Sequence, residues 1–132
     1  MVYAAPETQM VTDEYQFKYH DVAQYMASSA GVVVAYIDGR GSSGSGLERR
    51  AENYRRLGTL EVDDQIETTR QLVAARQFID PSAVAIFGTS YGGYVALQAL
   101  IRDHDFSPVF TCGIAVSPVT DWFYYDAVYS ER

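Results

Sequence analysis

Runs of uniformly apolar residues alternate along this chain with segments of helical periodicity. The runs 32–37 and 84–87 carry apolar side chains at every position, and most of those in the first run are β-branched. Such runs are typical of strands buried on both faces of a parallel sheet, whereas one-sided strands alternate apolar with polar residues. In 15–26 and 62–73 the repeating, mostly apolar positions step by four, three and four residues. That spacing predicts one face of a helix.

The order of these segments favours one architecture. Gly31 is expected to cap the first helix at its C-terminal end. The alternation predicts an α/β fold, with a mostly parallel sheet and helices on both faces. A length of 132 residues fits a single domain, because most domains run to about 100–200 residues. The expected strands and helices occupy, in order, 2–4, 15–30, 32–37, 62–73, 84–87, 91–102 and 112–116.

The composition narrows the class of partner. Apolar residues make up 48% of the chain, charged residues 20%, and the formal net charge is −7. An acidic chain disfavours nucleic acid as a partner, because phosphate binding needs a basic surface. No apolar run reaches about 18 residues, so we expect no membrane insertion by this segment, and the first residues do not resemble a signal peptide. Cys112 is the single cysteine, which excludes an internal disulfide and a cysteine metal site; we expect no metal and no cofactor.

The motif G-x-S-x-G occupies 88–92, directly after the run 84–87 and at the start of the helical segment 91–102. A strand, a tight turn and a helix in this order form the context of a nucleophile elbow, in which a strained turn lifts the serine hydroxyl above the sheet. Ser90 is therefore the candidate nucleophile, and the backbone N–H of Tyr91 is the candidate oxyanion donor. A glycine-rich turn with an exposed serine is the structural alternative.

A serine nucleophile needs a base, usually a histidine that a carboxylate orients. His104 is about 20 Å from Ser90 if the segment between them is helical. His20 precedes the serine, whereas the histidine follows it in this kind of site. Both are expected to be solvent-facing helix residues, so we expect no base in this chain. Asp121 and Asp38 follow predicted strands, as a catalytic acid does, but an aspartate there also caps a helix or structures a turn.

Four further stretches stand in a fixed order around the elbow. They are Val2-Tyr3-Ala4 with Pro6, the stretch 38–42, the stretches 57–62 and 64–67, and 112–116 continuing through Pro118-Val119 to 122–132. With Gly88 to Tyr94, they make the chain resemble the prolyl oligopeptidase family of serine peptidases. The resemblance is closest to the branch of dipeptidyl peptidase IV and fibroblast activation protein, and it extends over nearly the whole chain.

The resemblance implies that 1–132 is an incomplete α/β-hydrolase domain without the β-propeller of the family. It implies peptide substrates, from whose N-termini dipeptides are cleaved after proline or alanine. Ser90 matches the nucleophile, while the Tyr91 N–H and the Tyr3 hydroxyl match the oxyanion hole. The residues that match the wall of the proline pocket are Tyr91, Val119, Trp122, Tyr125 and Tyr129. Flat aromatic faces suit a rigid apolar ring, although ordinary packing is the alternative reading of these side chains.

Two departures from the family pattern bear on the pocket. Thr89 stands where the branch usually carries tryptophan, and Asp121 where a basic residue is common. The family's triad aspartate and histidine would lie beyond Arg132, and Cys112 matches a cysteine whose partner also lies further along. We therefore expect an active parent peptidase, homodimeric and either secreted or anchored outside the cell, and an inactive isolated chain. The alternatives are an inactive relative or truncated product that acts by binding, and an esterase or lipase on the same fold.

Overall fold

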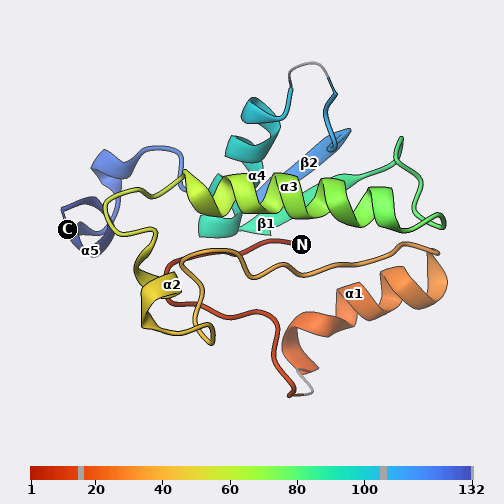
Figure 1. The fold of residues 1–132 in the computed structure, drawn as a ribbon, viewed down its shortest axis with the longest axis horizontal. Helices are drawn as coiled ribbons and strands as arrows, with labels where there is room; N and C mark the ends of the chain where they lie inside the picture. The colour runs from red at the N-terminus through yellow and green to blue at the C-terminus, as the bar shows by residue number, and fades with distance from the viewer. Residues whose placement is uncertain (15–16, 105–106, 132) are drawn as a thin grey trace.

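The computed structural model describes residues 1–14, 17–104 and 107–131, and of residues 17–21 the backbone alone. The predicted start of the first helix at Tyr15 lies outside the described residues. Figure 1 shows long helices beside a short pair of strands. The elements are α1 (Phe17–Ser29), α2 (Leu47–Ala51), α3 (Leu60–Ala75), β1 (Ala85–Thr89), α4 (Tyr91–Arg102), β2 (Cys112–Val116), the 3-10 helix η1 (Trp122–Tyr124) and α5 (Ala127–Ser130).

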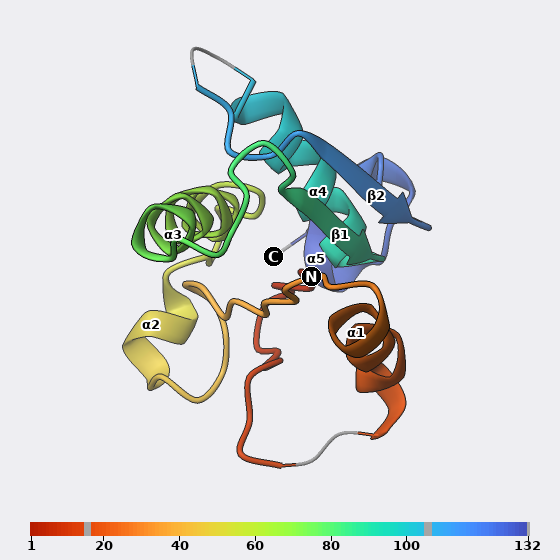
Figure 2. The same cartoon turned by 90° about the vertical axis from the view of Figure 1, so that its right-hand side faces the viewer.

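The strands β1 and β2 form a parallel pair, as the sequence predicts. Their register runs from Ala85 opposite Cys112 to Thr89 opposite Val116. The helix α4 connects them and packs against both, and Figure 2 shows it on one side of the pair. The last two predicted strands and the helix between them are therefore confirmed, and they form one strand–helix–strand unit.

The N-terminal residues lie beside β1 (Figure 1). The Val2 N–H donates to the carbonyl oxygen of Phe87 at 2.8 Å, and Val2 forms an isolated parallel bridge with Gly88. The terminal amino group donates to the carbonyl oxygen of Ala35 at 2.7 Å. The order across this layer is therefore the stretch 32–37, the N-terminus, β1 and β2.

The stretch 32–37 has no regular secondary structure, so the prediction of a buried strand there is wrong. Val33 is 54% exposed. The stretch is held by single contacts, such as the bond from the terminal amino group and a bond of 3.0 Å from Gln65 Nε2 to the Ile37 carbonyl oxygen. A β-branched run forms a strand where a neighbour offers a continuous ladder, and here the neighbour offers isolated groups. The predicted strand 2–4 is reduced to one bridge for the same reason.

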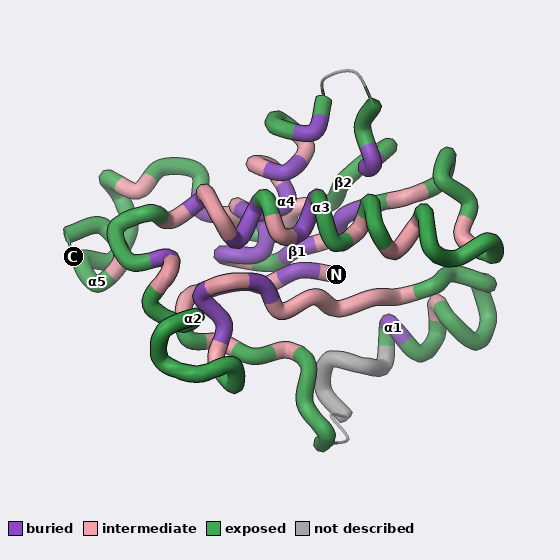
Figure 3. The backbone as a smooth tube through the Cα atoms, in the orientation of Figure 1, coloured by how far each residue is buried: buried purple, intermediate pink, exposed green. Residues whose placement is uncertain are grey.

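The core lies between α4, the first half of α3 and the N-terminal segment. The helix α3 packs along α4, and Val62 and Ile66 on its predicted apolar face are buried. Figure 3 shows the buried positions concentrated on these elements and on β1. The buried cluster consists of Val2, Ala4, Ala5, Val62, Ile66, Ile86, Tyr91, Val95, Ala96, Ala99, Val109 and Phe110.

The helix α1 stands apart, since no other helix or strand of the described part packs against it. The sequence predicts the helix correctly, and Gly31, with φ 67°, follows its end as expected. The apolar face of this helix is uncovered at Val22, which is 62% exposed. A helical period therefore identified the helix but not the surface that covers it.

One face of β2 is open in the described part of the chain. Gly113 faces α4, because a Cβ built there would lie 2.6 Å from Cδ1 of Leu100. Successive side chains of a strand point to opposite faces, so Ile114 and Val116 point away from α4. They are 56% and 42% exposed.

Candidate active site

Ser90 occupies the turn between β1 and α4 and is the N-cap residue of the helix. Its φ of 57° and ψ of −121° lie in a region that side chains with a Cβ rarely adopt. The Ser90 N–H donates to the Val116 carbonyl oxygen at 2.9 Å, and the Ser90 carbonyl oxygen accepts the Tyr94 N–H at 3.1 Å. The sheet and the helix therefore hold the strained turn between them. This is the strand–turn–helix geometry that the sequence predicts.

The two glycines of the motif permit a close approach of backbones. A Cβ at Gly88 would lie 2.0 Å from the carbonyl oxygen of Gly92, and a Cβ at Gly92 would lie 2.0 Å from that of Val2. Backbone atoms cannot rotate away as a flexible side chain can, so both positions require glycine. The same contact brings the N-terminal segment against the elbow.

A cleft of about 220 Å³ opens beside Ser90. Its other lining residues are the loop 117–121, Tyr124 and Tyr125. The loop leaves the carboxyl end of β2, and the elbow leaves the carboxyl end of β1. Because parallel strands end at the same edge of a sheet, the two neighbouring strands deliver the serine and the loop to one place.

Five aromatic rings contact one another next to this cleft, and we call them the aromatic cluster: Tyr91, Tyr94, Trp122, Tyr125 and Tyr129. The Trp122 ring centroid lies 5.1 Å from that of Tyr94, 5.5 Å from that of Tyr125 and 5.8 Å from that of Tyr91. The Tyr129 ring lies 5.5 Å from Tyr125 and 6.2 Å from Trp122. Tyr125 also lines the cleft, so it connects Ser90 with the cluster.

The predicted pocket residues take two positions relative to Ser90. Val119, which is buried, and Tyr125 line the cleft itself. The other three contact one another in the aromatic cluster, and two of them, Trp122 and Tyr129, also contact Tyr125; they are Tyr91, Trp122 and Tyr129. The structure thus brings all five together around the elbow. Their role in binding stays a prediction.

Tyr3 lies on the N-terminal side of the elbow. Its Cα would be 2.8 Å from a Cβ at Gly92, and its ring packs against the core. Burial raises the pKa of Tyr129, and the neighbouring phenols of Tyr3 and Tyr125 act in the same direction. The role of Tyr3 as an oxyanion donor stays a prediction, as does that of the Tyr91 N–H.

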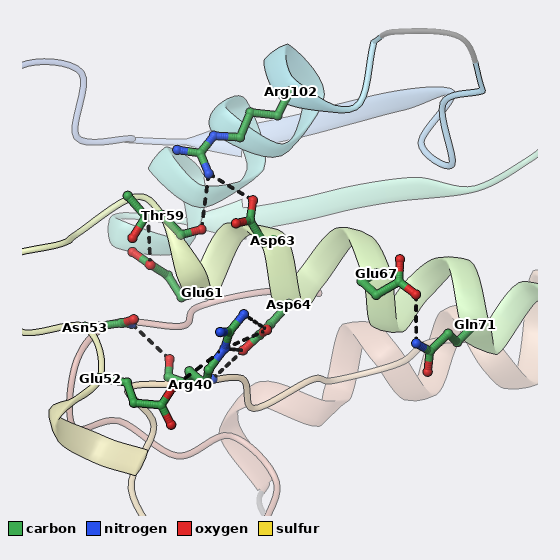
Figure 4. A network of polar contacts seen from close by, with 10 residues as sticks. All are labelled: Arg40, Glu52, Asn53, Thr59, Glu61, Asp63, Asp64, Glu67, Gln71 and Arg102. Carbon is green, nitrogen blue, oxygen red and sulfur yellow. Dashed lines mark hydrogen bonds and ion pairs between the residues drawn. The ribbon is translucent and has the colours of Figure 1, made fainter. Parts of the chain in front are cut away.

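One buried contact of the elbow has no signal in the sequence. Glu61, in the first turn of α3, is completely buried, and Figure 4 shows it beside Thr59. Its carboxylate accepts the N–H groups of Gly58 and Thr59 and, at 2.6 Å, the hydroxyl of Tyr91. Burial together with the charge and hydrogen bond of Glu61 raises the pKa of Tyr91. An acidic first turn is visible in the sequence, but its partner 30 residues later is not.

The two aspartates that follow predicted strands accept hydrogen bonds from backbone N–H groups. Asp121 accepts the Phe123 N–H at 2.9 Å and caps η1, although it also lines the cleft. Asp38 accepts the N–H groups of Met10 and Val11. Both therefore take the capping or turn-forming roles that the sequence left open.

The histidines lie away from the elbow as far as they are described. His104 follows the C-terminal end of α4, whereas Ser90 precedes its N-terminal end. His20 belongs to α1, and its side chain lies outside what the structure describes. In the described ranges no three histidine, cysteine or acidic side chains are grouped so as to hold a metal ion.

Comparison with known proteins decides the family. Residues 16–132 match the model of the prolyl oligopeptidase family. The chain belongs to this family. Its parallel strand pair with α4 is a portion of the α/β-hydrolase fold, and the expected resemblance is confirmed.

The individual relatives belong to the dipeptidyl peptidase 4 and FAP branch of the prolyl oligopeptidase family. The chain is 47% identical over 131 residues to "Venom dipeptidyl peptidase 4" of Vespa velutina. It is 47% identical to "Dipeptidyl peptidase 4" of Sus scrofa and 42% identical to "Prolyl endopeptidase FAP" of Homo sapiens. Each alignment covers 99% of this chain but 16% of the relative. No helix in the described ranges has the length and apolarity to cross a bilayer.

Proposed function

We propose that this chain carries the nucleophile and part of the substrate pocket of a serine peptidase that removes dipeptides from peptide N-termini after proline or alanine. One observation carries the proposal: Ser90 and Tyr125 line the same cleft, and Tyr125 contacts Trp122 and Tyr129. The relatives named dipeptidyl peptidase 4, at up to 47% identity, support this reaction class.

In the proposed reaction, Ser90 Oγ attacks the scissile carbonyl carbon and its proton passes to a histidine base. The carbonyl oxygen becomes an oxyanion, which accepts hydrogen bonds from the Tyr91 N–H and the Tyr3 hydroxyl. Loss of one such donor typically costs about 3–4 kcal/mol of transition-state stabilisation. The C–N bond then breaks, the protonated base gives its proton to the leaving amine, and water hydrolyses the acyl-serine.

The aromatic cluster is the proposed site of the proline ring. Its rings present large apolar faces, which bury a rigid ring with few hydrogen bonds. Val119 and Tyr125 form the part of this site nearest to Ser90. Alanine fits the same space with fewer contacts, so it is accepted less well.

We place the remaining parts of the reaction in a longer protein. The base and the triad acid, a propeller domain, a dimer interface and a location outside the cell, secreted or membrane-anchored, belong to the proposed parent. This chain contributes an incomplete α/β-hydrolase domain over 1–132.

Labelling and hydrolysis together test the proposal in the full-length protein. We expect a fluorophosphonate to label Ser90, and Ala-Pro reporters to be cleaved faster than simple esters. Ser90→Ala abolishes both reactions, whereas Ser45→Ala, a change in an exposed loop, leaves them intact. Labelling that persists in Ser90→Ala refutes the nucleophile. Faster hydrolysis of esters than of Ala-Pro reporters supports an esterase instead, and an unlabelled wild-type protein supports an inactive relative.

A further inference from the structure

Glu61 is a fully buried carboxylate that the proposed reaction does not use. Burial of a carboxylate is unfavourable unless hydrogen bonds replace its hydration. Two of its partners, the N–H groups of Gly58 and Thr59, lie just before the first turn of α3, and an acidic side chain of a first turn can accept such groups from an exposed position. The third partner is the Tyr91 hydroxyl at 2.6 Å. Glu61 can reach this hydroxyl only from its buried position.

The position of Tyr91 affects two parts of the candidate site. It directly follows Ser90 and begins α4, so its backbone carries the candidate oxyanion donor. Its ring lies 5.8 Å from that of Trp122 and 6.2 Å from that of Tyr129. A displaced Tyr91 would disturb both the donor and the aromatic cluster.

The turn that carries Glu61 is itself fixed against α4. The Arg102 guanidinium, at the far end of that helix, donates to the carbonyl oxygen of Thr59, as Figure 4 shows, and also to that of Gly58. Gly58, with φ 77°, lies so close to the Tyr94 ring that a Cβ there would overlap the phenol. Because the turn is anchored at several points, a hydrogen bond from it can define where the Tyr91 ring lies.

We propose that Glu61 is a positioning residue, whose carboxylate holds the Tyr91 side chain in place and thereby sets the preference of the peptidase for proline over alanine. The identity of the substrate rests on the proposed function above. Proline depends on the held ring more than alanine does, because a larger group loses more contacts when one wall of its site moves. Small displacements of positioned groups have large kinetic effects.

Paired variants of the full-length protein test this inference. Glu61→Gln and Tyr91→Phe each remove the charge-assisted bond while keeping the size of the side chain. We expect each to lower the ratio of kcat/KM for Ala-Pro over Ala-Ala reporters at least about fivefold. The double variant should be no worse than the single ones, because both remove the same contact. Glu67→Gln, the same change at an exposed site of α3, should leave the ratio unchanged.

A second readout follows the ring without any substrate. Nitration of Tyr91 by tetranitromethane, quantified by mass spectrometry, should be slow in the wild type and at least about fivefold faster in Glu61→Gln, since a released ring opens to the reagent. Nitration thus tests the inference even if the wild type cleaves neither reporter, an outcome that would refute the proposed function alone.

Three outcomes overturn the role of Glu61. They are a folded Glu61→Gln with unchanged Tyr91 nitration, additive losses in the double variant, and an unchanged proline preference in Tyr91→Phe. The last outcome decides the matter even if Glu61→Gln fails to fold.

Discussion

Ser90, the proposed nucleophile, has an unfavourable backbone conformation. Its φ of 57° is of a kind that costs about 1–3 kcal/mol for a residue with a Cβ. The bonds to Val116 and from Tyr94 offset part of this cost. The sequence predicts this turn because its signals are local: a strand, two glycines and a helix. It does not predict Glu61, whose partner Tyr91 comes close only when α3 packs on α4.

Replacement of Ser90 by glycine should stabilise the protein while abolishing fluorophosphonate labelling. Glycine adopts a positive φ without steric strain, so we expect a gain of about 1 kcal/mol in the free energy of unfolding. Denaturant titration measures it. Ser90→Ala retains the Cβ and is the matched control. A gain of the same size in Ser90→Ala would show that removal of the hydroxyl, rather than relief of strain, is the cause.

The glycines of the elbow should differ in their tolerance of alanine. In Gly92→Ala the new Cβ would lie 2.0 Å from the carbonyl oxygen of Val2, whereas in Gly93→Ala it would lie 3.0 Å from Cβ of Pro118. We expect Gly92→Ala to cost about 3 kcal/mol or more and Gly93→Ala clearly less. Thermal unfolding measures both, and equal losses would contradict the close approach of the N-terminal segment.

Among the helices and strands, the sequence predicts those that depend on neighbouring segments better than those that depend on distant contacts. The unit from β1 to β2 is predicted in type and direction, because its strands are apolar and its helix connects them. The stretch 32–37 has the same composition but lacks a continuous neighbour, so it forms no ladder. Its position is set instead by side chains such as Gln65 on α3. Contacts of that kind leave no periodic trace in a sequence.

Asp64 should make the packing of α3 against the 38–42 turn sensitive to acid. It binds the Arg40 backbone N–H at 2.7 Å and the guanidinium Nη2 at 2.6 Å (Figure 4). Burial alone would raise the pKa of Asp64, but the hydrogen bonds and charge of Arg40 outweigh it and hold that pKa below its usual value of 3.8.

A carboxyl with a lowered pKa in the folded state stabilises it at pH values above the unfolded pKa, and that contribution is lost as the pH falls through the folded pKa. We therefore expect Asp64→Asn to lower the free energy of unfolding by about 2 kcal/mol at pH 7. Between pH 5 and pH 3 the free energy of unfolding should then decrease less in the variant than in the wild type. Urea titrations across this range measure both effects. Asp13→Asn, at an exposed site, is the control, and an equal change there would contradict the role of the Arg40 pair.

For the molecule as a whole, the open face of β2 is the dominant feature. Ile114 and Val116 are exposed on it, and the chain spans 16% of the length of its relatives. An apolar strand that is uncovered on one face and unpaired on one edge associates readily with other copies. This face is therefore a surface through which copies of the chain can associate.

Polar substitutions on that face should reduce self-association of the 132-residue chain. We expect Ile114→Thr combined with Val116→Thr to shift the chain toward monomer, because threonine keeps the β-branch and removes apolar surface. Size-exclusion chromatography with light scattering measures the shift. Val22→Thr, on α1, removes an equally exposed apolar group and should have no effect. A similar shift in Val22→Thr would indicate nonspecific association through exposed apolar groups rather than association through this face.

The register of the strand pair has a consequence for how such a site can change. Thr89 lies opposite Val116, and each is followed at once by a segment of the candidate site, the serine turn on one strand and the cleft loop on the other. A slip of one residue would displace the loop by about 3.3 Å and exchange the two faces of the strand. An insertion after Tyr125 leaves that alignment intact. An insertion inside β2 would shift the cleft loop relative to the Ser90 hydroxyl. Length changes are therefore expected to be tolerated after Tyr125 rather than within β2.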